Sequence, residues 1–117
     1  MLNVVAETGR LVSTPELKHN TKQDKSVAYT KFRIAVDRDY KQEGKDRITD
    51  FFDVICWRGT AENVCKNFKK GQLITIKGAL QSNTYTDTNK VKHSVVEIVA
   101  ECVYYAEQKS SSVGANQ

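Results

Sequence analysis

Hydrophobic and polar residues alternate along most of this chain, which is the pattern of half-buried β-strands. The alternation predicts strands over 4–12, 27–36 and 49–58, and two further strands after Gln72 on either side of a polar turn at 86–90. Along 27–36, one face is apolar apart from threonine, while the other carries Tyr29, Lys31 and Arg33. We therefore expect five strands, the second of which has a basic outer face.

The period of the pattern changes between Thr60 and Lys70. Apolar residues recur there at spacings of three and four, as in an amphipathic helix: Ala61, Val64, Cys65 and Phe68. We expect Thr60 to cap the first turn and Gly71 to take the left-handed position that closes the helix. The order strand, strand, strand, helix, strand, strand is that of a five-stranded oligonucleotide-binding (OB) Greek-key barrel. The predicted fold class is all-β with one short helix.

Length and composition fit one small domain. The 117 residues are 39% hydrophobic and 27% charged, so one core is expected. We assign 1–105 to the OB domain and 106–117 to a short disordered tail, because AEQKSSSVGANQ has little to bury. No run approaches the roughly 18 apolar residues that span a bilayer, and 1–8 does not resemble a secretory signal. Three widely spaced cysteines at 56, 65 and 102 favour reduced thiols in the cytoplasm.

The strand at 49–58 places two large aromatic side chains on one face. Phe51 and Trp57 point to the same side, about 20 Å apart at roughly 3.3 Å per residue, which suits different bases of one extended strand. Tyr85, at the end of the fourth strand, and Tyr40, in the polar connection 37–48, add aromatics where an OB fold presents its ligand. Each stacked base contributes about 1–3 kcal/mol. An aromatic in a strand is as often a core residue, so that alternative stays open for Phe51 and Trp57.

Basic residues on outer strand faces are candidates for contacts with a phosphate backbone. Four of them would line a groove if their faces converge, although a lysine on a sheet surface is usually only solvated: Lys31, Arg33, Lys77 and Lys92. The balance of 18 basic and 14 acidic residues gives a formal charge of +4, which favours a polyanionic partner without deciding it.

Sequence signals of catalysis are absent. His19 and His93 are far apart in sequence, and no nucleophile elbow, phosphate-binding glycine loop or metal motif is present. Asp50 and Asp53 are three apart on a strand and face opposite ways, so they do not form a carboxylate pair. An enzyme such as a metal-dependent nuclease is disfavoured, and we expect no metal site and no cofactor.

Over nearly all of 1–105 the sequence resembles the bacterial and phage single-stranded DNA-binding proteins. The segments that carry this resemblance follow one another in the family's order and spacing: Thr8–Leu11, Thr14–Leu17, Phe32–Val36, Asp50–Phe52, Trp57–Arg58, Ala61–Val64, Lys69–Gly71, Ile76–Leu80 and Val95–Glu101. The resemblance implies a protein that coats single-stranded DNA during replication, recombination and repair, usually as a homotetramer in the cytoplasm at the nucleoid.

The resemblance also assigns roles to individual residues. It implies that the base-stacking aromatics are Tyr40, Phe51, Trp57 and Tyr85. Lys70 matches a basic residue near the DNA path, and Phe52 matches a position at subunit contacts. Gln81, Asn83 and Thr84 stand where many relatives have basic residues, so we expect a weaker salt dependence than is usual in the family.

The end of the chain also differs from the family pattern. It closes on SSVGANQ rather than on the long tail with an acidic tip that recruits repair and replication enzymes, so we do not expect this recruitment. The sequence is then either a piece of a longer protein or a short variant that only coats DNA. A competing hypothesis is an accessory OB subunit that binds a protein partner, for which the aromatics would be buried.

Overall fold

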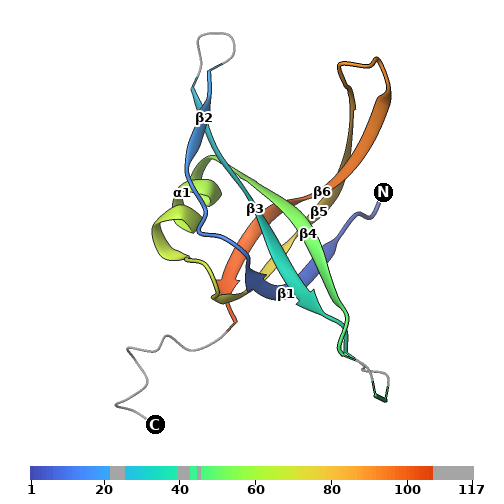
Figure 1. Ribbon diagram of the computed structural model, residues 1–117. Coiled ribbons are helices and arrows are strands. Elements are labelled where there is room, and N and C mark those ends of the chain that lie inside the picture. Colours follow the sequence, from blue (N-terminus) through green and yellow to red (C-terminus); the bar gives the residue numbers. More distant parts are fainter. Residues whose placement is uncertain (22–25, 40–42, 45, 107–117) are drawn as a thin grey trace.

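The computed structural model describes residues 1–21, 26–39, 43–44 and 46–106. Six strands and one helix follow each other along the chain (Figure 1): β1 (Val5–Leu11), β2 (Lys18–Asn20), β3 (Val27–Asp37), β4 (Thr49–Trp57), α1 (Arg58–Asn67), β5 (Leu73–Thr86) and β6 (Lys92–Tyr105). The tail assigned to 106–117 lies outside the described residues except for Ala106.

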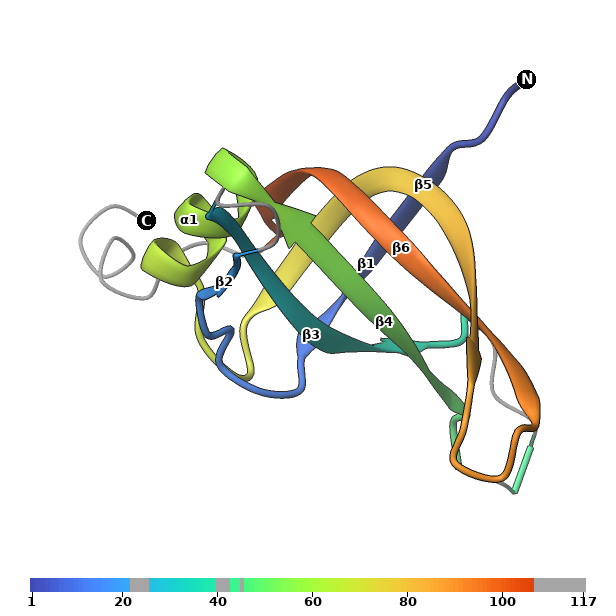
Figure 2. The same cartoon turned by 90° about the horizontal axis from the view of Figure 1, so that it is seen from above.

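Five of the strands close into a barrel. The hydrogen-bonded order is β1-β5-β6-β4-β3, and β1 pairs a second time with β3, which returns the sheet to its start. All pairings among these five are antiparallel except that of β4 with β6, which is parallel and short. Seen from above, the strands cross around a common centre, with α1 at one end of the barrel (Figure 2). The predicted OB barrel with one short helix is confirmed.

One strand was not predicted. β2 contains three polar residues and pairs with β3 at the edge of the sheet, with Lys18 opposite Tyr29 and Asn20 opposite Val27. Three polar residues show no alternation, so only their pairing with β3 makes them a strand.

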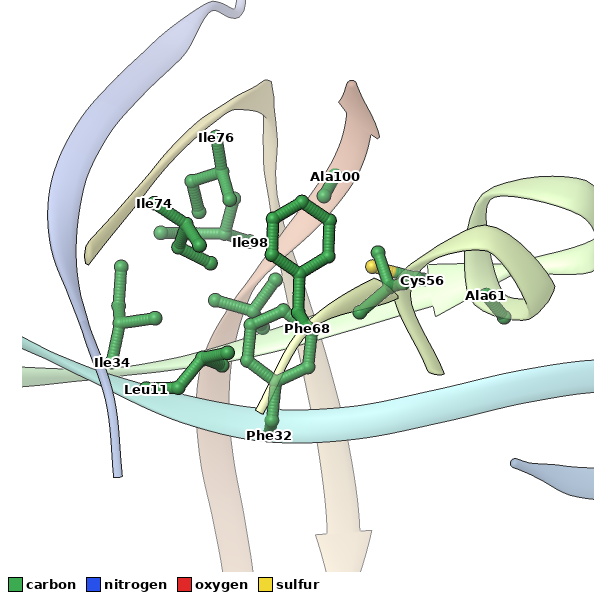
Figure 3. Packing of buried hydrophobic residues seen from close by; sticks show 12 residues of the cluster. Leu11, Phe32, Ile34, Cys56, Ala61, Phe68, Ile74, Ile76, Ile98 and Ala100 are labelled. Atoms are coloured by element: carbon green, nitrogen blue, oxygen red, sulfur yellow. The ribbon is translucent and has the colours of Figure 1, made fainter. Parts of the chain in front are cut away.

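The core fills the centre of the barrel and continues under α1. Its buried side chains come from every barrel strand and from the helix segment (Figure 3): Leu11, Phe32, Ile34, Val54, Cys56, Ala61, Val64, Phe68, Ile74, Ile76, Ile98 and Ala100. The apolar faces predicted for 27–36 and for the helix stripe are therefore the faces that pack inward. Phe68 contacts Tyr105 at 4.5 Å between ring centroids, which fixes the segment after α1 against the end of β6.

The boundaries of α1 differ from the prediction. The helix starts directly after β4, with Trp57 as its N-cap and Arg58 in a left-handed conformation at φ 53°. The expected Thr60 cap is wrong, because Thr60 lies inside the first turn and its hydroxyl donates to the Glu101 carbonyl at 3.4 Å. Gly71 does adopt a positive φ of 89°, but in the turn after the helix, where its N–H donates to the Leu11 carbonyl.

The β5–β6 hairpin extends beyond the barrel. Its pairing runs without interruption from Gly78 opposite Ala100 to Thr86 opposite Lys92, and the β5 residues from Leu80 onward are exposed. Figure 1 shows this outer half standing away from the barrel at the same end as the β2–β3 pair. We call residues 81–97 the hairpin arm.

Candidate nucleic-acid interface

The outer face of β3 and β4 carries four of the residues predicted to bind DNA. Antiparallel register places Tyr29 opposite Trp57, Lys31 opposite Ile55 and Arg33 opposite Asp53, so these side chains share one face. Phe51 lies on the same face of β4, six residues from Trp57. The side chains of Phe51 and Trp57 are 57% and 37% exposed, so neither is a core residue.

The hairpin arm faces this surface and completes a groove. One pocket of about 520 Å³ lies between the strands and the outer part of the arm, and is lined by Lys31, Phe32, Arg33, Asp53, Val54, Tyr85, Val95 and Glu97. A neighbouring pocket of about 270 Å³ is lined by Asn20, Tyr29, Lys31, Ile55, Trp57, Gln81, Asn83 and Glu97. Lys31 and Glu97 belong to both pockets, so the two form one groove with Trp57 on one wall and Tyr85 on the other.

Each predicted cation in the groove is paired with a carboxylate. The Lys31 ammonium lies 3.6 Å from Glu97, and the Arg33 Nε lies 3.0 Å from Asp53. Asn83 also donates a hydrogen bond of 3.0 Å to Glu97 from the arm. Exposed ion pairs of this kind contribute little to stability, and they offset part of the positive charge of the groove.

Trp57 is held at the junction of β4 and α1. Its backbone is extended, with φ −118° and ψ 150°, and it makes no side-chain cap hydrogen bond to the helix. Its ring lies against Tyr29, with centroids 5.5 Å apart and the planes tilted by 39°. The indole is thus fixed on one side by a second aromatic ring, and its exposed part lines the groove.

Tyr85 is supported from the other strand of the arm. Its ring stacks on that of His93 at 5.0 Å, and the His93 Nε2 lies 2.7 Å from Asp87 Oδ2. This contact with His93 is the main cause that holds the pKa of the Asp87 carboxyl below its usual range, and the Val91 N–H adds to it. Asp87 therefore ties the turn of the hairpin to the ring that supports Tyr85.

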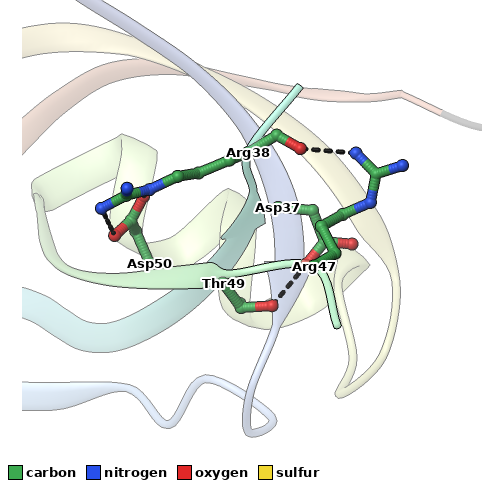
Figure 4. A network of polar contacts seen from close by, with 5 residues as sticks. All are labelled: Asp37, Arg38, Arg47, Thr49 and Asp50. Carbon is green, nitrogen blue, oxygen red and sulfur yellow. Dashed lines mark hydrogen bonds and ion pairs between the residues drawn. The ribbon is translucent and has the colours of Figure 1, made fainter. Parts of the chain in front are cut away.

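A polar network anchors the loop that carries Tyr40. Tyr40 itself lies outside the described residues, but the two ends of its loop are joined by hydrogen bonds (Figure 4). Arg38 donates two bonds to the Asp50 carboxylate, and Arg47 donates to the Arg38 carbonyl. The Arg38 guanidinium also lowers the pKa of Asp50. The loop thus leaves the barrel close to Phe51, at the far end of the β4 face.

Three predicted residues lie away from the groove. Lys77 is on the outer face of β1, β5 and β6, opposite Ala6 and Cys102. Lys70 is in the turn after the helix segment, where its N–H donates to the Thr14 hydroxyl. Phe52 is on the opposite face of β4, where it is half-buried and packs against the core.

Sequence reasoning assigned no binding role to Tyr29, Asn83 and Glu97, which line the groove, or to His93, which stacks on Tyr85. From the sequence, His93 enters only as a rejected catalytic residue and Asn83 only as a missing cation. The contacts of His93 with Tyr85 and of Asn83 with Glu97 depend on the register of the hairpin. These residues could be recognised as neighbours only once the register of the hairpin is known, because the register decides which side chains of the two arm strands lie opposite each other.

No feature of the described residues points to catalysis. They contain no group of three or more histidine, cysteine or acidic side chains that could hold a metal. Burial raises the pKa of the Cys56 thiol to about 12, so it is not a nucleophile at neutral pH. Among the same residues, no helix has the length and apolar character needed to span a membrane.

The chain is similar to known proteins over almost its whole length. The model of the single-strand binding protein family matches residues 2–106. A single-stranded DNA-binding protein of Caldanaerobacter subterraneus subsp. tengcongensis is 37% identical over 110 residues, which cover 94% of this chain and 71% of the relative. Single-stranded DNA-binding protein 2 of Listeria monocytogenes is 34% identical over 113 residues, 97% of this chain and 69% of the relative. Single-stranded DNA-binding protein 1 of Lactococcus lactis is 41% identical over 101 residues, which cover 86% of this chain and 65% of the relative.

Proposed function

Because this chain belongs to the single-strand binding protein family, we propose that it coats single-stranded DNA along the groove between the β3–β4 face and the hairpin arm. It binds DNA and is not an enzyme. Its work is the protection of single strands exposed during replication, recombination and repair. Since its ligand is single-stranded DNA, it is proposed to act in the cytoplasm at the nucleoid. Residues 1–105 are proposed as the binding domain.

The observation that carries the proposal is the placement of Trp57 and Tyr85 on opposite walls of one groove, with Lys31 and Arg33 between them. Aromatic rings stack on any base, since every base has a π face, and the cations attract the phosphate backbone. Phe51 extends the stacking surface along β4, and Tyr40 is proposed to extend it further from the adjoining loop. Lys70 and Lys77, which lie away from the groove, are proposed to contact the DNA beyond it.

Titration of the fluorescence of Trp57, the only tryptophan, tests the proposal. Oligo-dT of about 16 nucleotides, at the upper end of OB-fold site sizes, should quench it, whereas duplex DNA of the same length should not. Salt should weaken binding with a log–log slope of about −0.7 per phosphate engaged. The total slope should be shallow, because both groove cations already have carboxylate partners and few phosphates are then engaged. Absence of quenching and of oligonucleotide retention would favour the accessory OB subunit instead.

We propose further that the protein assembles as a homotetramer with Phe52 at a subunit contact. Phe52 is only half-buried by its own chain, and apolar side chains remain exposed elsewhere: Val4, Leu80 and Val96 are 58%, 47% and 59% exposed. Apolar area of this kind is commonly covered by another subunit. Sedimentation equilibrium without DNA should give the mass of four chains. A single-chain mass over the micromolar range would contradict the assembly.

A further inference from the structure

Glu97 occupies a position in the groove that phosphate binding does not explain. A carboxylate repels the DNA backbone, yet Glu97 lines both the pocket that contains Trp57 and the pocket that contains Tyr85. Glu97 is more deeply buried than the two cations of the groove. The side chains of Lys31 and Arg33 are 59% and 56% exposed, whereas that of Glu97 is only 14% exposed. Backbone phosphates would therefore meet the cations at the rim, while a base turned inward would meet the carboxylate.

The pocket around Glu97 has the character of a base-binding site. Its volume of about 270 Å³ lies just below the range of about 300–1,000 Å³ for small-molecule pockets, which suits one base. Trp57 and Tyr29 provide stacking surface, and Gln81, Asn83 and Glu97 provide polar groups. Stacking alone accepts any base, but a carboxylate distinguishes donors from acceptors on the edge of that base.

The hydrogen bonds of Glu97 leave part of its carboxylate available. Asn83 donates to Oε1 at 3.0 Å and so fixes the orientation of the group. Oε2 lies 3.6 Å from the Lys31 ammonium, which is longer than a direct hydrogen bond. A carboxylate has about four lone-pair sites and donates nothing when ionised, so it can accept a further N–H but cannot pair with a carbonyl.

We propose that Glu97, oriented by Asn83, is a base-reading site that favours a base with an exocyclic amino group, cytosine above thymine. Cytosine presents its N4 amino group to such an acceptor, whereas thymine presents the O4 carbonyl at the same position. The inference rests on the proposed function, because it adds a preference at one subsite to a groove that otherwise binds any sequence.

The test compares two oligonucleotides on three proteins. Wild type, Glu97→Gln and the control Glu101→Gln are titrated at neutral pH with oligo-dC and oligo-dT of about 16 nucleotides, using Trp57 fluorescence. Glutamine keeps the shape but both donates and accepts, so it discriminates little. Glu101→Gln makes the same charge change at an exposed position on β6 that lines neither pocket. The quantity of interest is the ratio of dC to dT affinity.

We expect Glu97→Gln to lower this ratio by about fivefold, the effect of one hydrogen bond of about 1 kcal/mol, and Glu101→Gln to leave it unchanged. Release of Lys31 raises both affinities together and does not alter the ratio. Asn83→Ala keeps the charge but removes the orienting hydrogen bond, so it should lower the ratio as well. An unchanged ratio in Glu97→Gln, with both affinities shifted equally, overturns the base-reading site while leaving DNA coating intact. Failure of wild type to bind either strand overturns both.

Discussion

Replacing Trp57 by alanine lowers the affinity for single-stranded DNA by about 5-fold to 150-fold and leaves the barrel folded. The range corresponds to the loss of about 1–3 kcal/mol of stacking per base. The variant loses the contact of the ring with Tyr29. The fold is kept because the ring is not in the core, and because Trp57 caps α1 through its backbone without a side-chain hydrogen bond. Anisotropy of a labelled oligo-dT measures the affinity, since the variant has no tryptophan.

Tyr104→Ala is the matched control for this substitution. Tyr104 is 55% exposed on β6, but it lies opposite Thr75 on the other outer face of the sheet and lines neither pocket of the groove. Loss of the Tyr104 ring should leave the affinity for DNA within about twofold of the wild-type value. Loss of a stacked base would lower it by about fivefold or more, which corresponds to about 1 kcal/mol. Equal losses from the two substitutions would show that exposed aromatics act without regard to the groove.

Replacing Gly78 by alanine destabilises the barrel by about 3 kcal/mol or more. A Cβ at this position would lie 2.0 Å from the Val99 carbonyl oxygen and 2.9 Å from the Ala100 Cα. These are backbone atoms of the neighbouring strand, so they cannot turn aside as a side chain would. Gly78 also lies at the β-bulge between β5 and β6, where the register shifts by one residue. Denaturant unfolding measures the loss.

Gly59→Ala should have the opposite sign. Gly59 lies in the first turn of α1, and a Cβ there would meet nothing within 4 Å. Alanine favours the helix over glycine by up to about 1 kcal/mol, so the variant should be slightly more stable than the wild type. If both alanine variants changed stability alike, close approach of the strand backbones would not be the reason that Gly78 is required.

Alternation alone predicted the barrel strands because each of them buries one face. It failed for β2, whose three polar residues bury none, and for the start of α1. There the strand passes directly into the helix through the left-handed Arg58, without the polar cap residue that usually marks a helix start. Local sequence carries little information about either feature, since both depend on where the neighbouring strands lie.

The sequence predicted the wall of the candidate site that β3 and β4 form, but not how the hairpin arm completes the second wall. Period-2 alternation placed Phe51 and Trp57 on one face of β4, and Lys31 and Arg33 on the matching face of β3. The second wall required the register and direction of the hairpin, which set Glu97 beneath Lys31 and His93 behind Tyr85. The alternation along β5 shows only that Lys77 lies on the outside of the barrel. It does not show on which side of the closed barrel that position lies.

The hairpin arm gives the groove one rigid wall and one compliant wall. The β3–β4 face belongs to the barrel and can move only with the core, whereas the arm is a two-stranded ribbon fixed at one end. Bending of such a ribbon relative to the barrel disrupts only the few contacts of the arm itself. These include the contacts of Glu97 with Lys31 and Asn83. If DNA binds in the groove as proposed, deflection of this one wall would let a strand enter or leave while the barrel that holds Trp57 stays folded.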